Sequence, residues 1–431
     1  MTERGETFAV MGLGQVGLRL AVALGARYRT LGIDVSKDRA ALLSQGIDRV
    51  EAVPSATLKA AKLLSFSSEV TAVQDADLVF VTVPTAVHPA GQPDLSELTN
   101  CCEQIAGHLK PGAIIVVEST VYPGATEDLC IPALEKVSGK LWKKDFFVAY
   151  SPERINPGDQ EHQLPNIRKV VAADCVDTLE RVARVYESII PAGVHRVSSI
   201  KAAETTKLIE NVQRDVNIAL VNELSMICHK NGVDTAEVLA AAATKWNFVS
   251  YQPGLVGGPC LGLASHFLAR GYGPGDEAAS LMQTGRQLNE GMSAFVVQEL
   301  LHQCSDLHRP GSLPQVLVLG LSFKANISST KNSKVLELVS ALGATGCDVT
   351  SHDPLADAGL DQSAFPRRPV TWDSLPQVSD ALILAVAHDF YQTQSLEKLC
   401  SLVRPGGLVM DLTGTLDAVG IARLGRRFWR F

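Results

Sequence analysis

The sequence predicts an α/β protein with two doubly wound, Rossmann-like parallel sheets, joined by a long central helix and a helical layer. Three observations lead to this prediction. Short apolar runs alternate with helix-length stretches over residues 8–149, the same rhythm returns over residues 315–411, and residues 199–230 between them carry no strand signal. Strands buried on both faces form continuous apolar runs, and helix-length connections place helices on both faces of a parallel sheet.

The strands of the first sheet are predicted from apolar runs that are each followed by enough residues for a helix. They lie at residues 8–11, 30–33, 78–83, 113–117 and 146–149. After Pro310 the pattern starts again and predicts a second sheet. Its strands are expected at residues 315–319, 347–350, 380–386 and 407–411.

The central helix is predicted over residues 199–230, where apolar side chains follow the helical period. Ser199 is expected to cap its start and Gly232 to follow its end. About thirty residues at 1.5 Å each make a helix of ~45 Å, long enough to connect two domains. We expect further helices in residues 233–305, and a helical layer of this kind is suited to a dimer interface.

Length, charge and cysteine content limit the possible classes of protein. A chain of 431 residues exceeds the ~250–300 residues at which one core stops growing, so we expect domains at residues 1–197, 198–305 and 306–431. The net charge of −7 argues against nucleic-acid binding, and no apolar run is long enough to span a membrane. The start of the chain lacks the order of a signal peptide. Nine scattered cysteines without a CxxC pair favour a reduced, cytoplasmic setting and no metal site.

A dinucleotide-binding turn is predicted between the first strand and the following helix, at Gly12–Gly17. Gly12 permits the tight turn, Gly14 lets the backbone approach a pyrophosphate, and Gly17 lets the helix pack closely on the strand. Asp34 ends the second strand, where a carboxylate accepts hydrogen bonds from the adenosine ribose and repels a 2′-phosphate. The sequence therefore predicts NAD rather than NADP. The second half has Gly320–Lys324 after its first strand, without the glycine triplet, so we expect it to bind something else or to bind a nucleotide differently.

A candidate nucleophile, Cys260, lies among glycines in the segment Gly257–Gly262. A thiolate near a nicotinamide can add to an aldehyde, and the adduct can then lose hydride. Lys207 and Asn211, spaced i, i+4 on the predicted central helix, share one face and are suited to stabilise an oxyanion. The alternatives are a buried structural cysteine, a solvated lysine and an asparagine that packs against a neighbouring helix.

Polar residues also follow two strands of the first sheet, in Glu118–Thr120 and Ser151–Arg154. The carboxyl ends of parallel strands are where open α/β sheets bind ligands. Glu153 is therefore a candidate base or water-holding group, with an ordinary surface carboxylate as the alternative.

Together these motifs resemble the nucleotide-sugar dehydrogenase family, which includes UDP-glucose, UDP-N-acetylmannosamine and UDP-N-acetylhexosamine 6-dehydrogenases. The resemblance covers essentially the whole chain, and Thr244–Phe248 is more like the N-acetylhexosamine branch than the UDP-glucose branch. The matching segments are Gly12–Gly17, Val83–Thr85, Glu118–Gly124, Ser151–Gly158, Lys207–Glu223, Gly257–Cys260, Phe323–Lys324 and His352–Pro354.

The resemblance implies a four-electron oxidation of a sugar C6 alcohol to a carboxylate with two NAD⁺. Cys260 would capture the aldehyde, Lys207 and Asn211 would stabilise the oxyanion, and Glu153 with Thr120 would position water or relay a proton. The implied cofactor contacts are Gly12, Gly14, Gln15, Val16, Gly17, Asp34, Arg39, Pro84, Thr85, Ser119, Thr120 and Lys331. The implied substrate contacts are Arg154, Lys207, Asn211, Tyr251, Gly257 and Lys324.

The resemblance also implies the domain roles and the partners. Residues 1–197 would bind NAD, residues 198–305 would form a dimerisation layer that carries the cysteine segment, and residues 306–431 would bind the UDP-sugar. The partners would be a UDP-sugar substrate and further copies of the chain in a homodimer or larger homo-oligomer, with no nucleic acid and no membrane.

Three positions depart from the family pattern. Ala264 stands where the family has an aspartate four residues after the cysteine, Lys331 replaces an arginine, and Thr413 replaces a basic residue. Loss of a carboxylate that orients water reduces a rate by a factor on the order of 10², and lysine lacks the bidentate fork of arginine. His266 is a candidate substitute base or a packed residue. Two alternatives to full activity follow: a homologue that binds NAD or UDP-sugar without catalysis, and a two-electron dehydrogenase that stops at the aldehyde.

Overall fold

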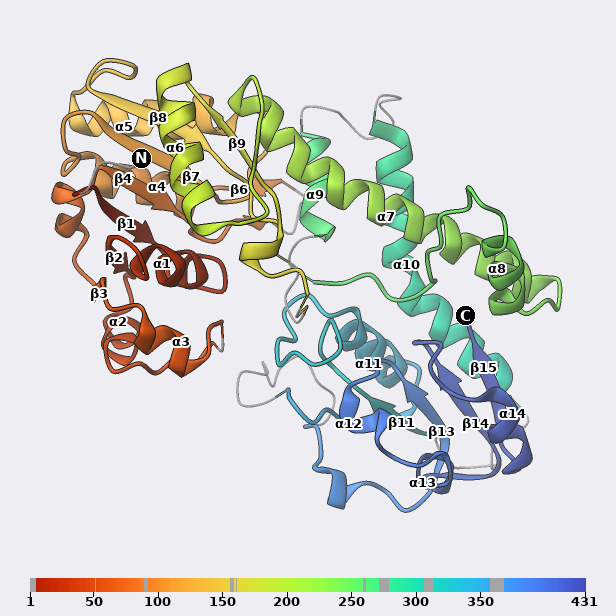
Figure 1. The fold of residues 1–431 in the computed structure, drawn as a ribbon. Helices are drawn as coiled ribbons and strands as arrows, with labels where there is room; N and C mark the ends of the chain where they lie inside the picture. Colours follow the sequence, from red (N-terminus) through yellow and green to blue (C-terminus); the bar gives the residue numbers. More distant parts are fainter. Residues whose placement is uncertain are drawn as a thin grey trace. The chain divides into compact units, whose positions relative to one another are not determined.

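The computed structural model describes residues 5–50, 52–88, 92–155, 159, 161–258, 261–270, 279–305, 314–356 and 368–431. The chain divides into two compact units, each with its own sheet (Figure 1). The first unit comprises Met1–Glu210 with His266–Arg270, and the second comprises Asn211–Ser265 with Gly271–Phe431. The three expected domain ranges stay a prediction, because this division falls within the central helix.

The first unit is built on an eight-stranded sheet with β1 and β4 near its centre. On each side of this pair, the strands follow one another toward the edge in the order of the sequence. In spatial order the strands are β10 (Val194–Arg196), β9 (Lys169–Ala173), β8 (Phe146–Tyr150), β7 (Ala113–Val117), β4 (Leu78–Val81), β1 (Thr7–Met11), β2 (Arg29–Ile33) and β3 (Leu64–Ser67). The pairs are parallel except β8 with β9, which is antiparallel. A separate short hairpin joins β5 (Ala86–Val87) to β6 (Pro93–Asp94).

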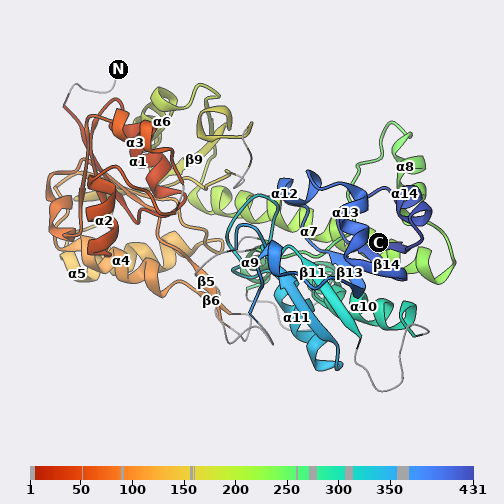
Figure 2. The same cartoon turned by 90° about the horizontal axis from the view of Figure 1, so that it is seen from below.

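Helices cover both faces of this sheet. They are α1 (Gly17–Gly25), α2 (Lys37–Ser44), α3 (Ser55–Ala60), α4 (Ser96–Ala106), α5 (Ile131–Ser138) and α6 (Val176–Ile189). Alternate residues of a strand point to opposite faces, so Phe8 and Val10 pack into one apolar core with residues of α1 and α6. Both views place α4 and α5 on the other face (Figures 1 and 2).

The second unit has a five-stranded parallel sheet covered by helices on both faces. Its strands, in spatial order, are β12 (Asp348–His352), β11 (Gln315–Leu319), β13 (Ser379–Leu384), β14 (Val403–Asp411) and β15 (Arg427–Arg430). Val316 and Val318 belong to one apolar core, whereas Leu317 and Leu319 belong to the core on the opposite face. Four helices precede this sheet: α7 (Ile200–Lys230), α8 (Thr235–Ala243), α9 (Leu261–Leu268) and α10 (Ser280–Gln303). Of these, α7 and α9 are divided between the two units. The remaining helices are α11 (Lys334–Ala344), α12 (Asp389–Gln392), α13 (Leu396–Ser401) and α14 (Ala418–Arg423).

The long central helix is confirmed as α7. The Ser199 hydroxyl accepts a hydrogen bond from Ala202 N at 3.2 Å, and Gly232 follows the helix at φ +66°. The fold class is likewise confirmed, including the strand predicted at residues 113–117. Among the described residues, no helix is both long and apolar enough to cross a membrane.

Two expectations about the fold need correction. The first sheet is not wholly parallel, because β9 returns antiparallel beside β8. Residues 244–258 contain no helix, so the expected helical layer is interrupted before α9. Six of the described strands have no counterpart among the predicted runs: β3, β9, β10 and β15 at or near sheet edges, and the hairpin strands β5 and β6.

Candidate functional site

The turn after β1 has the geometry that a bound pyrophosphate needs. Gly12 has φ +88°, and a side chain at Gly17 would place its Cβ 1.9 Å from Gly12 O. Gly14 is exposed, and a Cβ there would meet nothing within 4 Å. The turn therefore leaves Gly14 open to a ligand in front of the N-terminus of α1, where free N–H groups and the helix dipole favour an anion.

Two charged side chains brace this turn. Asp34 Oδ2 accepts a hydrogen bond from Leu13 N at 2.9 Å, and Oδ1 accepts one from Ser36 N at 3.0 Å. Arg39 donates from Nε and Nη2 to Leu13 O at 2.9 and 2.6 Å, and its Nη1 lies 2.8 Å from Asp48 Oδ1. Asp34 is thus aimed at the turn from the end of β2, whereas the guanidinium of Arg39 bonds to the protein itself.

Strand order brings four other predicted cofactor residues, Pro84, Thr85, Ser119 and Thr120, to the same edge of the first sheet. The order changes direction between β1 and β4, and such a switch point leaves a crevice at the carboxyl ends of the strands. Thr82 Oγ1, after β4, donates to Gly12 O at 2.7 Å. Ser119 Oγ, after β7, donates to Val83 O at 2.7 Å. The segments holding Pro84, Thr85 and Thr120 are therefore tied to the glycine turn.

Gln15 and Val16 lie in the turn itself, and the Gln15 side chain reaches away from the sheet. Its Nε2 donates to Val50 O at 2.6 Å. This bond fastens the turn to the chain that leads into α3.

A buried charge cluster lies at the carboxyl edge beside β7 and β8. Lys169 Nζ is 2.6 Å from Glu118 Oε2 and 3.6 Å from Glu153 Oε2. Tyr186 OH donates to the other oxygen of Glu118. Burial raises the pKa of Glu118, although Lys169 opposes this. Burial alone would lower the pKa of Lys169, but Glu118 and Glu153 outweigh it and raise that pKa.

Neither Lys169 nor its ion pair with Glu118 was predicted from the sequence. Lys169 opens the apolar strand β9 with Val170 and Val171, and a lysine inside an apolar run is a weak signal of a buried ion pair. The pairing itself leaves no local pattern, because the partners are 51 residues apart.

Glu153 and Arg154 turn in different directions from the chain after β8. Glu153 Oε1 accepts hydrogen bonds from Arg154 N at 2.7 Å and Ile155 N at 2.5 Å. Arg154 instead forms an ion pair with Glu210 of α7 at 2.7 Å and donates to Arg168 O at 2.9 Å. The predicted substrate contact at Arg154 therefore already holds the loop against α7 within the first unit.

The loop that carries Thr120 is anchored by the first turns of α7. Glu204 accepts hydrogen bonds from Gly124 N at 2.5 Å and Thr126 N at 2.9 Å. Its carboxylate thus caps the helical segment that begins at Thr126, which fixes the path of the chain after Thr120.

Lys207 and Asn211 follow one turn apart on α7, as the spacing predicts. Asn211 is buried, and its Nδ2 finds no hydrogen-bond acceptor within the described part of the chain. A buried donor without a partner is destabilising unless a ligand or water satisfies it. This amide therefore fits the predicted role of an oxyanion donor.

Cys260 lies outside the described residues, but the glycines before it are well placed. Gly258 N donates to Asn332 O at 2.9 Å, and a Cβ on Gly257 would lie 2.6 Å from that same oxygen. A Cβ on Gly258, which has φ +96°, would lie 2.7 Å from the Phe323 ring. The glycines thus allow the segment to pack on the loop that carries Lys324 and Lys331. Tyr251, earlier in the segment, is half-buried.

Ala264, which stands where the family pattern has an aspartate, is buried in α9. Its neighbour Ser265 donates to Asp215 Oδ2 at 3.1 Å, and Asp215 in turn pairs with the buried Arg286 at 2.8 Å. His266 is two positions after Ala264, and helix side chains at that spacing do not share a face. His266 therefore does not occupy the place that an aspartate at 264 would have.

Thr413, another departure, caps its own loop. It donates from Oγ1 to Asp411 Oδ1 at 2.6 Å, at the end of β14. No cluster of three or more His, Cys, Asp or Glu side chains suited to a metal occurs in the part of the chain that the structure describes.

Comparison with known proteins gives matches along nearly the whole chain. Three models of the UDP-glucose/GDP-mannose dehydrogenase family match: the NAD binding domain at residues 6–190, the central domain at 201–291 and the UDP binding domain at 317–418.

Individual relatives match over similar lengths. The chain is 43% identical to a UDP-N-acetyl-D-glucosamine 6-dehydrogenase from Pseudomonas aeruginosa, over 95% of this chain and 97% of the relative. It is 38% identical to one from Salmonella typhi, over 95% and 96%. A solved structure of UDP-D-ManNAc dehydrogenase from Pyrococcus horikoshii aligns with a TM-score of 0.85 at 25% identity, covering 98% of both chains.

Proposed function

The chain belongs to the UDP-glucose/GDP-mannose dehydrogenase family, and we propose that it oxidises the C6 alcohol of a UDP-N-acetylhexosamine to the carboxylate with NAD⁺. The observation that carries this proposal is the 43% identity, over 95% of the chain, to a UDP-N-acetyl-D-glucosamine 6-dehydrogenase. Two oxidations at one carbon require a group that holds the aldehyde between them, and Cys260 is the candidate.

NAD⁺ supplies the hydride acceptor for both oxidations when it is bound. The residues that would hold it are those gathered at the carboxyl edge of the first sheet. Gly14 would accept the pyrophosphate against its backbone, and Asp34 would take the adenosine ribose hydroxyls, with Arg39 beside them. Pro84, Thr85, Ser119 and Thr120 would border the nicotinamide half. Lys331 is the remaining residue proposed for the cofactor.

The chemistry of the chain's own residues follows from their types. The Cys260 thiolate adds to the aldehyde carbon to give a thiohemiacetal, whose carbon is then oxidised to a thioester. Lys207 and the unsatisfied amide of Asn211 stabilise the oxygen that carries negative charge in these steps. Water then adds to the thioester, which releases the carboxylate product and the thiol. Glu153, with Thr120, would orient that water and accept its proton.

Substrate recognition is assigned to residues near the Gly257–Gly258 segment and the loop Phe323–Ser333. Tyr251, Gly257 and Lys324 would contact the UDP-sugar, and Arg154 would do so from the loop after β8. Residues 1–197 would bind NAD, residues 198–305 would dimerise and residues 306–431 would bind the UDP-sugar.

The test is a screen for NADH formation with UDP-GlcNAc, UDP-GalNAc, UDP-ManNAc and UDP-glucose. We expect NADH with at least one UDP-N-acetylhexosamine and loss of turnover in Cys260→Ser. The proposal fails if none of the four sugars yields NADH.

A second candidate function is a homologue that binds NAD and UDP-sugar without completing catalysis. The buried methyl of Ala264 favours it, because no carboxylate stands at that position and His266 faces elsewhere on α9. Thermal stabilisation by NAD⁺ and UDP-sugar together with no NADH would support this candidate over the enzyme.

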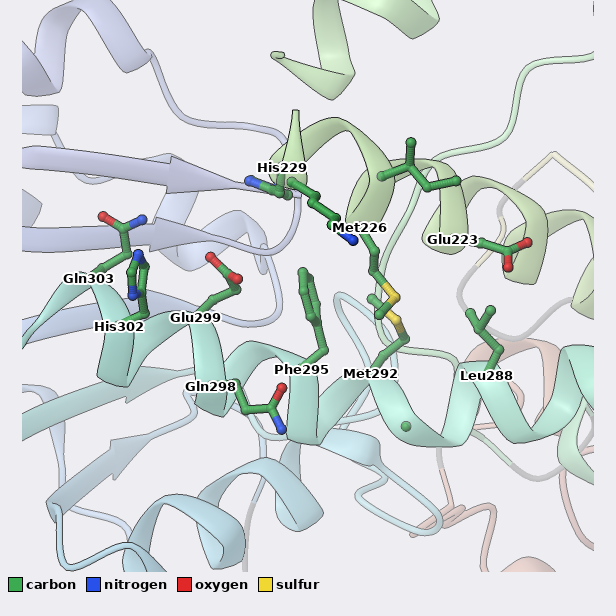
Figure 3. Close-up of a pocket in the computed structure, with 13 residues that line it drawn as sticks. Glu223, Met226, His229, Leu288, Met292, Phe295, Gln298, Glu299, His302 and Gln303 are labelled. Atoms are coloured by element: carbon green, nitrogen blue, oxygen red, sulfur yellow. The ribbon is translucent and has the colours of Figure 1, made fainter. Parts of the chain in front are cut away.

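The partner of the helical layer is proposed to be a second copy of the chain. A groove of about 820 Å³ runs between α7 and α10 and is lined by Met226, Ile227, Met292 and Phe295 among others (Figure 3). The apolar side chains of Leu220 and Ile227 on α7 are about half exposed, and exposed apolar patches mark interaction surfaces. Light scattering would give a dimer or larger assembly for the wild type and a monomer for Ile227→Glu.

A further inference from the structure

Lys169 is a buried ammonium between two carboxylates, and its position follows from strand direction. β9 runs antiparallel to β8, so the first residue of β9 lies at the carboxyl end of β8. Glu118 follows β7 at the same edge, and Glu153 follows β8. The side chain of Lys169 is 3% exposed and that of Glu118 is fully buried, so the pair is out of contact with water.

The cluster contains one cation for two anions. The oxygens of Glu118 are both occupied, one by Lys169 and the other by the Tyr186 hydroxyl. An ammonium has three donors. Nζ of Lys169 is also 3.6 Å from Glu153 Oε2, so the ammonium attracts that carboxylate as well. A buried ion pair adds little net stability compared with apolar packing, so stability alone does not account for a lysine here.

Both oxygens of the Glu153 carboxylate have partners. The backbone N–H groups of Arg154 and Ile155 fix Oε1, and Lys169 faces Oε2. The carboxylate therefore has a fixed direction, and its side chain is 14% exposed.

We propose that Lys169 is a positioning residue that fixes the direction of the Glu153 carboxylate through Oε2, while Glu118 holds the Lys169 ammonium in place. This inference rests on the proposed role of Glu153 in the dehydrogenase reaction. Nothing in the proposed function assigns a role to Lys169 or Glu118.

Other charged or polar groups near Glu153 come from several elements. Arg19 of α1 interacts electrostatically with Glu153, and the Tyr186 hydroxyl of α6 donates a hydrogen bond to Glu118. Arg154 is neutralised by Glu210 of α7 at 2.7 Å. Lys169 is therefore the cation that contacts the Glu153 carboxylate directly among these groups.

Two variants separate this role from a merely structural one. Glu118→Gln leaves the lysine to Glu153 alone and removes a like charge, so the acid limb of the kcat profile should move to lower pH. Lys169→Met with Glu118→Gln removes the buried pair as a unit, avoids an uncompensated buried carboxylate, and should move that limb to higher pH. Each displacement should be about one pH unit, as expected for a charge within ~4–6 Å.

The measurements are the pH dependence of kcat and, at neutral pH, the carbon-13 chemical shift of the Glu153 carboxyl in labelled protein, with Glu153→Gln used to assign the signal. We expect the acid limb of the kcat profile to move in opposite directions in the two variants, and the Glu153 signal to move in both. An unchanged Glu153 signal, or a kcat limb that moves in one direction for both variants, would overturn the proposal. The carbon-13 signal needs no turnover, so a protein that forms no NADH would refute the proposed function without deciding the role of Lys169.

Discussion

The turns after β1 and β11 have the same backbone design but different surroundings. Gly12 and Gly320 begin them at φ +88° and +87°. In each turn, the residue after the glycine donates its backbone N–H to an aspartate that follows the neighbouring strand. Leu13 donates to Asp34 at 2.9 Å, and Leu321 donates to Asp353 at 2.6 Å.

The difference lies in what else each carboxylate and turn contact. Gly14 is exposed with open space around it, whereas the corresponding Ser322 is buried and donates to Lys324 O at 2.9 Å. Both aspartates are half-buried as whole residues, but the side chain of Asp353 is fully buried and lies 3.1 Å from His388 Nε2. The first turn is therefore open to a dinucleotide, and the second uses the same carboxylate position to hold its own loop.

The largest expected effect is the loss of stability in Asp353→Asn. Asp353 accepts hydrogen bonds from several backbone N–H groups and from His388, and an amide cannot satisfy them all. Because hydrogen bonds to a buried charge are the stronger kind, we expect a loss of about 3 kcal/mol in the free energy of unfolding. Denaturant unfolding measures it, with Asp34→Asn as the matched control at the open turn, where the loss should stay below ~1 kcal/mol.

The next effect is on NAD⁺ affinity in the glycine turn. A Cβ on Gly17 would clash with Gly12 O and with Thr82 Oγ1 at 2.3 Å, so Gly17→Ala must displace the turn and should weaken NAD⁺ binding by about 100-fold or ~2.7 kcal/mol. Calorimetric titration measures the affinity.

Gly14→Ala sharpens this result, because its Cβ meets no protein atom within 4 Å. It should fold with wild-type stability and still bind NAD⁺ about 10-fold more weakly, since the methyl group meets the pyrophosphate. Wild-type affinity in Gly14→Ala would mean that the cofactor does not approach this turn.

A smaller effect is expected on the choice of cofactor in Asp34→Asn. Removing the charge should weaken NAD⁺ binding and reduce the preference for NAD⁺ over NADP⁺, each by about tenfold or ~1.4 kcal/mol. Titrations with both cofactors test this. The corresponding Asp353→Asn change should leave the preference unaltered.

The smallest effect concerns acid stability. Burial would raise the pKa of Asp353, but the hydrogen bonds from His388 and Leu321 outweigh it and lower the pKa well below its usual range. A carboxyl whose pKa is lowered by folding contributes stability above its unfolded pKa of about 3.9, and that contribution fades as the pH falls further. The stability of the wild type should thus fall below about pH 4 more steeply than that of Asp353→Asn, as measured by denaturant midpoints.

The glycine turn and the central helix were predictable because their signals are local. Gly12–Gly17 specifies its own backbone, and β7 is a continuous apolar run because both of its faces are covered. The strand β9 has a similar apolar run but begins with Lys169, and its antiparallel direction depends on how the chain returns after β8. The ion pair of Lys169 with Glu118 and the contact of Gly258 with Asn332 join distant parts of the sequence, which no periodicity indicates.

The departures at Ala264 and Lys331 were visible in the sequence, but their surroundings were not. Only the structure shows that Ser265, next to Ala264, donates a hydrogen bond to Asp215. The interpretation of the first turn as the NAD site therefore rests on local geometry, while the chemistry depends on groups whose arrangement the sequence alone does not specify.

The most direct test of the account is the number of NADH molecules formed for each UDP-N-acetylhexosamine consumed, counted at completion with limiting sugar and excess NAD⁺. Two NADH per sugar, together with a carboxylate product, is the predicted result. One NADH would show that the enzyme stops at the aldehyde, and none would contradict the assignment of this chain as a dehydrogenase.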